Sequence, residues 1–272
     1  MSDRELSGFS PVDVVGDWAL DKHSTLCKYT HICQAVRRKF TLSGATYIDL
    51  YCGAGKARIR DSGQIVDGSP MVAAKKARST RSDFRTIYIA DADATKLEAC
   101  SARLSDEGFK VEAFHGRSED TVHEVLERLH PAAFHFAFLD PFSIDLPFSV
   151  IEALAQLRCI DIMLLISDMD LIRNVENEHI DAKRARLDRF APGWRSALDL
   201  HQPKRNLARA VLEYWRTQVD CLGLKRPAEI RPIKAGKHSH IYHLALLSQN
   251  EKLSNRFWKA VLASETKQIG LF

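Results

Sequence analysis

The sequence has no long hydrophobic run and no paired cysteines. No apolar stretch among its 272 residues approaches the roughly 18 that span a bilayer, and residues 1–10 lack a basic start followed by an apolar segment. We therefore expect a cytoplasmic protein with no membrane partner. The six cysteines are scattered, without C-x-x-C pairs or Cys/His spacing typical of zinc. Reduced thiols and no metal site follow as expectations.

The charge excess is small. The net charge is +4 and the pI about 8.7, with 45% hydrophobic and 27% charged residues, a balance typical of a single globular domain. Solvated helix faces and a shared phosphate-binding surface explain the basic groups equally well. Those groups are Arg37, Arg38 and Lys39; Lys75, Lys76, Arg78, Arg81 and Arg85; Lys183, Arg184, Arg186 and Arg189; Lys204, Arg205 and Arg209.

Short β-prone runs alternate with segments of helical periodicity along most of the chain. Strands are expected at 47–51, 86–90, 111–114, 133–139 and 160–166, and helices at 18–40, 71–81, 94–105, 121–129 and 150–157. This alternation predicts an α/β fold with a doubly wound, Rossmann-like sheet. A long loop, 56–68, would separate the first strand from its helix.

One domain, 1–272, is predicted, with four parts. Residues 1–44 would form an N-terminal helical cap and 45–168 the cofactor-binding core. The charged, irregular segment 169–205 would be an insertion after the fifth strand that could face the substrate. Residues 206–272 would hold a helix, two hairpin strands and a tail.

The clearest motif is the segment 49–55, DLYCGAG, at the end of the first strand. Glycines let the backbone approach a ligand closely, and open α/β sheets bind ligands beyond the carboxyl ends of their strands. Arg58 stands where a dinucleotide site has its third glycine, which disfavours such a site. We expect Asp49, Tyr51, Gly53 and Gly55 to bind a nucleotide-like cofactor.

Asp91 ends the second strand and is followed by Ala92. A carboxylate in this place can accept hydrogen bonds from both ribose hydroxyls of an adenosyl cofactor. Asp93, two residues on, could serve the same purpose or cap the following helix. Asp91 is the preferred ribose acceptor, with Ala92 beside it.

Asp140, Pro141 and Phe142 follow the apolar fourth strand. Asp140 could accept a hydrogen bond from a substrate amino group, proline frees nearby carbonyls to accept others, and Phe142 could stack on a base. The alternative is an ordinary strand-ending turn. Neither a G-x-S-x-G elbow nor a P-loop occurs, which disfavours hydrolases and nucleoside triphosphatases.

These motifs resemble those of class I S-adenosylmethionine-dependent methyltransferases, and more closely of the three-Cys-motif partner protein family. The closer resemblance rests on Trp18, Lys22, Leu26 and Tyr29, on 49–55, on 140–142, and on 242–248 followed by Phe257 and Trp258. It implies a seven-stranded methyltransferase sheet with the last strand antiparallel, S-adenosylmethionine as cofactor, and a Cys-motif protein as partner. The family's usual acidic residue after the third strand, at the cofactor's adenine end, is replaced in this chain by Arg117 and Ser118.

The resemblance further implies a catalytic role for Asp140, Pro141 and Phe142, because enzymes that methylate exocyclic base nitrogens carry a similar motif. Trp18 and Lys22 could close over the same cleft, although packing is the simpler role for Trp18. Three hypotheses remain: a nucleic-acid methyltransferase, a catalytically idle cofactor-binding partner subunit, and a methyltransferase acting on a small molecule or protein. A non-basic surface around the pocket would favour the third.

The segment Gln268–Phe272, QIGLF, ends the sequence with two large apolar residues. It is similar to the short peptide by which bacterial replication and repair proteins dock on the sliding clamp, so the clamp is a candidate partner. The alternative is that Leu271 and Phe272 pack on a helix at 257–262.

Overall fold

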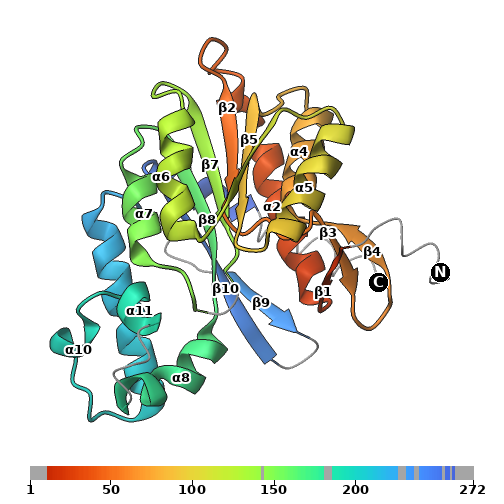
Figure 1. Ribbon diagram of the computed structural model, residues 1–272. Coiled ribbons are helices and arrows are strands. Elements are labelled where there is room, and N and C mark those ends of the chain that lie inside the picture. Colours follow the sequence, from red (N-terminus) through yellow and green to blue (C-terminus); the bar gives the residue numbers. More distant parts are fainter. Residues whose placement is uncertain are drawn as a thin grey trace.

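The computed structural model describes residues 11–141, 144–180, 186–225, 231–235, 239–252, 255–257 and 259–260. Its central sheet (Figure 1) has the strand order β6-β5-β2-β7-β8-β10-β9. The strands are β2 (Ala45–Asp49), β5 (Thr86–Asp91), β6 (Val111–His115), β7 (Phe134–Leu139), β8 (Ile160–Ile166), β9 (Arg231–Ala235) and β10 (Ser239–Ser248). The strands from β6 to β8 are mutually parallel, whereas β10 is antiparallel to β8 and β9. The predicted α/β, Rossmann-like fold class is confirmed.

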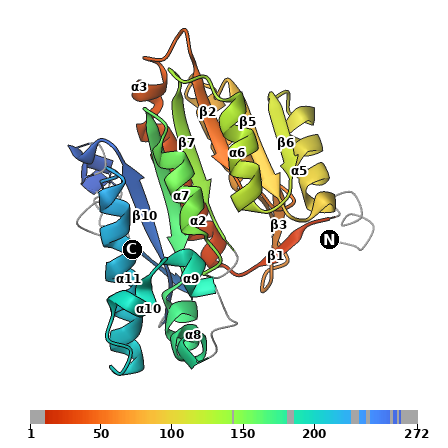
Figure 2. The same cartoon turned by 60° about the vertical axis from the view of Figure 1, so that its left-hand side comes forward.

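Helices cover both faces of this sheet (Figures 1 and 2). One layer contains α2 (Trp18–Ile32), α4 (Ser69–Ser79) and α5 (Ala94–Asp106); the other contains α6 (Ser118–Arg128), α7 (Phe148–Ala155) and α11 (Lys204–Cys221). Each face of the sheet packs against its own hydrophobic core. Successive strand residues point into different cores, as Tyr47 and Ile48 do. Burial on both faces explains why β7 and β8 read as continuous apolar runs.

A second, small sheet replaces the long loop expected at 56–68. It has the order β1-β3-β4, formed by β1 (Asp13–Val15), β3 (Lys56–Ile59) and β4 (Ile65–Asp67). The β3 side chains alternate in burial, with Ala57 and Ile59 inside, a pattern typical of a strand with one covered face. The sheet places β1 beside the loop that follows β2.

The helix predicted at 18–40 is shorter and interrupted. It ends at Ile32, and after Cys33 a separate turn, α3 (Gln34–Arg37), follows. This turn directs the buried Arg37 guanidinium inward, where it donates to the carbonyls of Thr30 (2.7 Å) and Ser82 (2.8 Å). Arg37 therefore belongs to the packing, not to a phosphate-binding surface.

The irregular insertion expected at 169–205 is largely helical, so that part of the prediction is wrong. The segment contains α8 (Asp168–Ile180), α9 (Arg186–Phe190) and α10 (Trp194–Ala197). Leu187, Phe190 and Trp194 are fully buried, with Phe190 stacked on Trp215 of α11 at a ring distance of 5.3 Å. The turn at Pro192–Gly193 interrupts the helical spacing of these apolar residues, so the sequence pattern does not predict the helices.

Several sequence features lie outside the described residues: Phe142, the basic pair at 183–184, Trp258 and the tail at 268–272. Within the described ranges, no helix is both long enough and apolar enough to cross a membrane.

Candidate functional site

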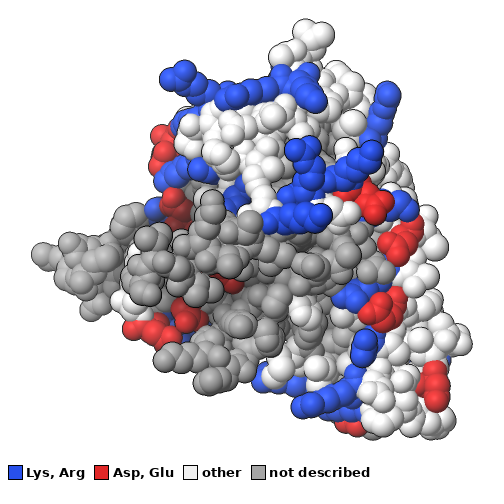
Figure 3. Space-filling view, turned by 180° about the vertical axis from the view of Figure 1, so that it is seen from behind, with Lys and Arg blue, Asp and Glu red and all other residues white. Residues whose placement is uncertain are grey.

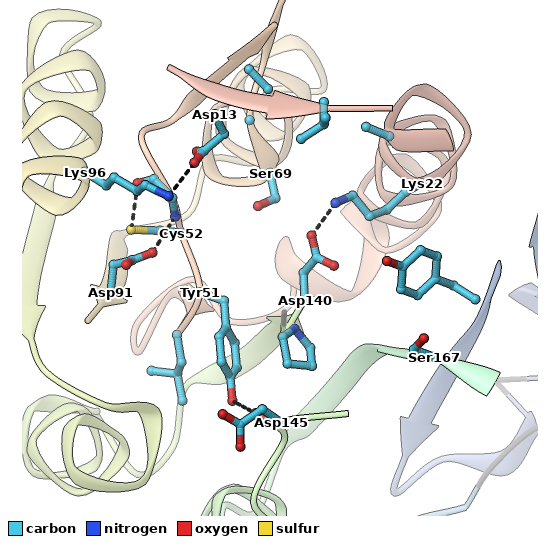
Figure 4. Close-up of a pocket in the computed structure, with 18 of the residues that line it drawn as sticks. Asp13, Lys22, Tyr51, Cys52, Ser69, Asp91, Lys96, Asp140, Asp145 and Ser167 are labelled. Atoms are coloured by element: carbon cyan, nitrogen blue, oxygen red, sulfur yellow. Dashed lines mark hydrogen bonds and ion pairs between the residues drawn. The ribbon is translucent and has the colours of Figure 1, made fainter. Parts of the chain in front are cut away.

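A cleft with a volume of 890 Å³ opens at the carboxyl ends of β2, β5, β7 and β8, within the range of ligand sites in proteins. Residues at or just beyond the ends of these strands line it, including Tyr51, Asp91, Asp140 and Ser167 (Figure 4). This is where open α/β sheets bind ligands.

The loop after β2 depends on two glycines in the left-handed region. Gly53 has a φ of +56° and Gly55 a φ of +73°. Residues other than glycine adopt such values only at a cost in free energy. A Cβ on Gly53 would lie 2.4 Å from Oδ2 of Asp13, and one on Gly55 3.2 Å from Cα of Cys100. Gly53 lines the cleft, whereas Gly55 packs against α5 and is absent from the lining. Gly55 therefore serves the packing of the loop, and its contact with a cofactor stays a prediction.

Asp49 lies beneath this loop and not in the cleft lining, in contrast to its expected place among the cofactor contacts. Its fully buried carboxylate accepts hydrogen bonds from Tyr51 N (3.1 Å), the Tyr47 hydroxyl (3.0 Å) and the Ser69 hydroxyl (2.8 Å). Burial raises the pKa of Asp49 to about 7. The Ser69 hydroxyl thus ties α4 to the loop, and the N-cap residue of α4 is Gly68.

Asp91 joins the loop to the end of β5. Its Oδ2 accepts from Gly53 N and its Oδ1 from Asp93 N, both at 2.9 Å. Each carboxylate oxygen can accept a second hydrogen bond, so Asp91 can still serve a ligand in the cleft, which Ala92 also lines. Asp93 accepts from the amides of Thr95 and Lys96, which confirms the helix-cap interpretation.

Asp13 and Lys96 complete this side of the cleft, and the sequence analysis missed both. Oδ2 of Asp13 accepts from Ala54 N, and Oδ1 pairs with Nζ of Lys96, both at 2.8 Å. Figure 4 shows the two side chains meeting above Cys52. A lone acidic residue in a three-residue strand gives no sequence pattern that could have identified it.

Tyr51 and Ser118 meet beyond Asp91. The Tyr51 hydroxyl lies 2.8 Å from Oγ of Ser118 and donates to the Asp145 carbonyl at 3.3 Å. Arg117 also lines the cleft, half exposed and paired with Glu119 at 2.9 Å. The structure thus brings Tyr51, Arg117 and Ser118 together at one end of the cleft.

Lys22, Trp18 and Tyr242 surround Asp140 at the other end of the cleft. Nζ of Lys22 forms an ion pair with Oδ2 of Asp140 and lies 4.9 Å from the Trp18 ring centroid. The Trp18 and Tyr242 rings are 5.0 Å apart. Trp18 and Lys22 face the cleft together because residues four apart share one side of a helix. Trp18 therefore both packs and lines the cleft, as Pro141 also does.

The described lining carries no excess of positive charge. Its basic members are Lys22, Lys56, Arg60, Lys96, Arg117 and Arg173; its acidic members are Asp13, Asp91, Glu119, Asp140, Asp145 and Asp170. The two signs are equally represented. Among the described residues, those of the cleft included, no group of three or more His, Cys, Asp or Glu side chains is suited to hold a metal ion.

Exposed basic residues gather instead at the opposite edge of the sheet. Lys39 precedes β2, Arg85 precedes β5, and both are exposed, as is Arg81. The amino ends of parallel strands lie opposite the carboxyl ends that form the cleft. Figure 3 shows Lys and Arg side chains along the upper part of the rear face. This basic surface is therefore separate from the cleft.

No family model matches the chain, and no curated protein matches it. Among solved structures, a protein from Legionella pneumophila has a TM-score of 0.50 at 11% identity, covering 87% of this chain and 89% of that one. An rRNA methylase from Streptococcus thermophilus gives 0.39 at 14%, covering 84% and 93%. TYW2 from M. jannaschii in complex with AdoMet gives 0.41 at 9%, covering 86% and 76%. At these identities the likeness to the Legionella protein shows a shared fold and nothing further.

Proposed function

We propose that this chain is an S-adenosylmethionine-dependent methyltransferase that acts on an amino nitrogen. One observation carries the proposal: Gly53, Asp91 and Asp140 line a single cleft across the carboxyl ends of β2, β5 and β7. The first two residues suit an adenosyl cofactor, and the third suits an amine.

The residues present fit this cofactor. Asp91 keeps hydrogen-bonding capacity for ribose hydroxyls, and the left-handed Gly53 keeps the loop free of a side chain. Arg117 and Ser118 line the cleft beyond the ribose position, and Asp13 with Lys96 lies on the other side of Gly53. A carboxylate and an ammonium group there suit the amino-acid end of the cofactor.

Catalysis would rest mainly on positioning. Bound S-adenosylmethionine would supply an electrophilic methyl group, which the amine lone pair takes with loss of one proton while the C–S electron pair stays on sulfur. Asp140 would accept a hydrogen bond from the acceptor amine and orient its lone pair. Pro141, which has no backbone N–H, lines the cleft beside Asp140.

We propose an amine on a protein or small molecule as the acceptor. The lining has equal numbers of basic and acidic side chains, so it offers no net positive charge to attract a phosphate backbone. The exposed basic residues Lys39, Arg81 and Arg85 lie at the opposite end of the strands from the cleft. A base nitrogen of nucleic acid is the second candidate, favoured by the position of Asp140–Pro141 at the end of β7.

Titration calorimetry with S-adenosylmethionine tests the cofactor assignment. Asp91→Ala should weaken binding by about 5- to 150-fold, corresponding to roughly 1 to 3 kcal/mol for a charged acceptor. Asp93→Ala is the matched control: its side chain caps α5 and is absent from the cleft lining, so affinity should stay within about twofold while stability falls by ~1 kcal/mol. Equal affinities in wild type and Asp91→Ala would refute the ribose role.

Two further proposals concern partners. A Cys-motif protein would be the partner of this chain if it belongs to the three-Cys-motif partner family, and the tail Gln268–Phe272 would dock on a sliding clamp. A pull-down with the intact chain and with a chain lacking residues 268–272 tests both.

An idle partner subunit would bind cofactor yet transfer no methyl group to any acceptor.

A further inference from the structure

Asp140 holds an ammonium group of the protein itself. The Lys22 side chain is only 5% exposed, and its Nζ forms an ion pair with Asp140, whose side chain is 20% exposed. Figure 4 shows the two side chains pointing toward each other across the cleft. Isolating such a pair from water is costly, and α2 is already anchored by Leu26 and Tyr29, both fully buried. Packing alone therefore does not require a charge at Lys22.

The side chains around this ammonium form a site suited to a cation, which we call the cation-binding box. Its members are Trp18, Asp140, Asp170 and Tyr242. The Trp18 ring lies 4.9 Å from Nζ of Lys22, within the range of a cation–π interaction, and Tyr242 lies beside Trp18. Burial raises the pKa of Tyr242, and the charges of Asp140 and Asp170 raise it further. All three side chains line the same cleft. Aromatic faces and carboxylates together favour a positive guest.

The neighbouring His23 does not compete as a cation. Burial, together with the charge of Lys22, lowers the pKa of His23 to about 3. His23 is therefore neutral at physiological pH, and the Lys22 ammonium is the cation that Asp140 holds.

We infer that the acceptor subsite is built for a protonated primary alkyl amine and that Lys22 occupies it in the free protein. The inference rests on the proposed function, because Asp140 would orient the acceptor nitrogen. A neutral exocyclic base amine in the place of the Lys22 ammonium would leave the Asp140 carboxylate without a cation in a largely desolvated place. An alkylammonium group would replace the Lys22 ammonium by another ammonium. It would lose one proton to solvent water at the open side of the cleft before its nitrogen attacks the methyl carbon.

Binding of n-butylammonium chloride to Lys22→Ala tests the box without any methyl transfer. Trp18 fluorescence reports binding, and Trp18→Phe in the same background shows which signal belongs to Trp18. We expect saturable millimolar binding to Lys22→Ala, at least tenfold weaker binding to Lys22→Ala/Asp140→Asn, and weaker binding to wild type than to Lys22→Ala, because the guest must displace Lys22 from the box. No binding to Lys22→Ala, or equal binding to the double variant, overturns the inference.

A transfer assay on the wild-type protein covers the case in which Lys22→Ala does not fold. Labelled S-adenosylmethionine is offered with a lysine-containing peptide, with n-butylamine, and with single-stranded RNA and DNA. Transfer to the peptide or to n-butylamine supports the inference and separates the two sources of the amine. Transfer to nucleic acid alone overturns the inference. Transfer to none of the acceptors by a protein that binds S-adenosylmethionine indicates an idle partner subunit and overturns the proposed function as well. A protein that binds no S-adenosylmethionine refutes the proposed function instead, a result that the ammonium titration cannot produce.

Discussion

Asp49 shows how one buried carboxylate organises a binding loop without touching a ligand. Its three hydrogen bonds join the end of β2, the start of the glycine loop and the first residue of α4. The segment 49–55 could be recognised from the sequence because glycine spacing after an apolar strand is a local pattern. The depth of Asp49 could not, because it depends on α4 and Tyr47 packing over it, contacts that no local pattern records.

Asp49 should make the protein less stable as the pH rises from 4 to 7. The pKa is about 7 in the folded chain against a usual value of 3.8, so the folded state binds this proton more tightly. The stabilisation is complete below pH 4 and is lost as the pH rises through 7. Three pKa units correspond to roughly 4 kcal/mol as an upper value. Urea unfolding at pH 4.5 and 7.5 should show this loss in wild type.

Asp49→Asn is the comparison for that experiment, because it keeps the shape of the side chain and removes its ionisation. Its unfolding free energy should depend less on pH over this interval, although its stability at pH 4.5 should fall as hydrogen bonds rearrange. Identical pH profiles for the two proteins would show that Asp49 is ionised throughout.

At the scale of elements, long periodic segments were predictable and short ones were not. Helix α5 was expected at 94–105 and extends over Ala94–Asp106, and β8 was expected and found at 160–166. The small sheet was missed because β1 and β4 have three residues each, too few for periodicity. Their pairing with β3 depends on contacts distant in sequence, and this pairing brings Asp13 to the cleft.

Strand β1 should contribute to cofactor affinity through Asp13. In Asp13→Ala the amide of Ala54 loses its acceptor and Lys96 its ion-pair partner, so the glycine loop gains freedom that binding must remove. We expect a 3- to 30-fold loss of S-adenosylmethionine affinity and a loss of stability of about 1 to 2 kcal/mol. Titration calorimetry and urea unfolding measure the two effects.

Asp17→Ala provides the control within the same segment. Asp17 is exposed, makes no side-chain cap hydrogen bond to α2 and does not line the cleft, so both quantities should match wild type. A comparable loss of affinity in the two variants would indicate a general effect of acidic charge and not the anchoring of the loop by β1.

On the scale of the whole molecule, the two faces of the sheet bury the thiols to different degrees. The described chain has six free cysteines: Cys33, Cys52 and Cys100 are buried, Cys27 and Cys159 are intermediate, and Cys221 is exposed. Ellman's reagent should therefore react first with Cys221 and reach the buried three only on unfolding. Burial also raises the pKa of Cys33 to about 12, which keeps it as an unreactive thiol.

The kinetics of that reaction identify the residues. Cys221→Ser should abolish the fast phase and leave the slower phases unchanged. In guanidinium chloride all six thiols of the wild-type protein should react. A fast phase of two or more thiols in Cys221→Ser would mean that the helical layers open in solution more than their packing indicates.

The approach of Asp13 to Gly53 couples two positions that are distant in sequence. A Cβ at position 53 would meet Oδ2 of Asp13 at 2.4 Å, so alanine there would have to push the carboxylate away from its hydrogen bond with Ala54 N and also adopt a left-handed backbone. Shortening residue 13 removes the first obstacle and leaves only the conformational cost of roughly 1 to 2 kcal/mol. The effects of the two substitutions should therefore be non-additive. Epistasis of this kind predicts that a side chain at position 53 is tolerated better in variants that lack the carboxylate on β1.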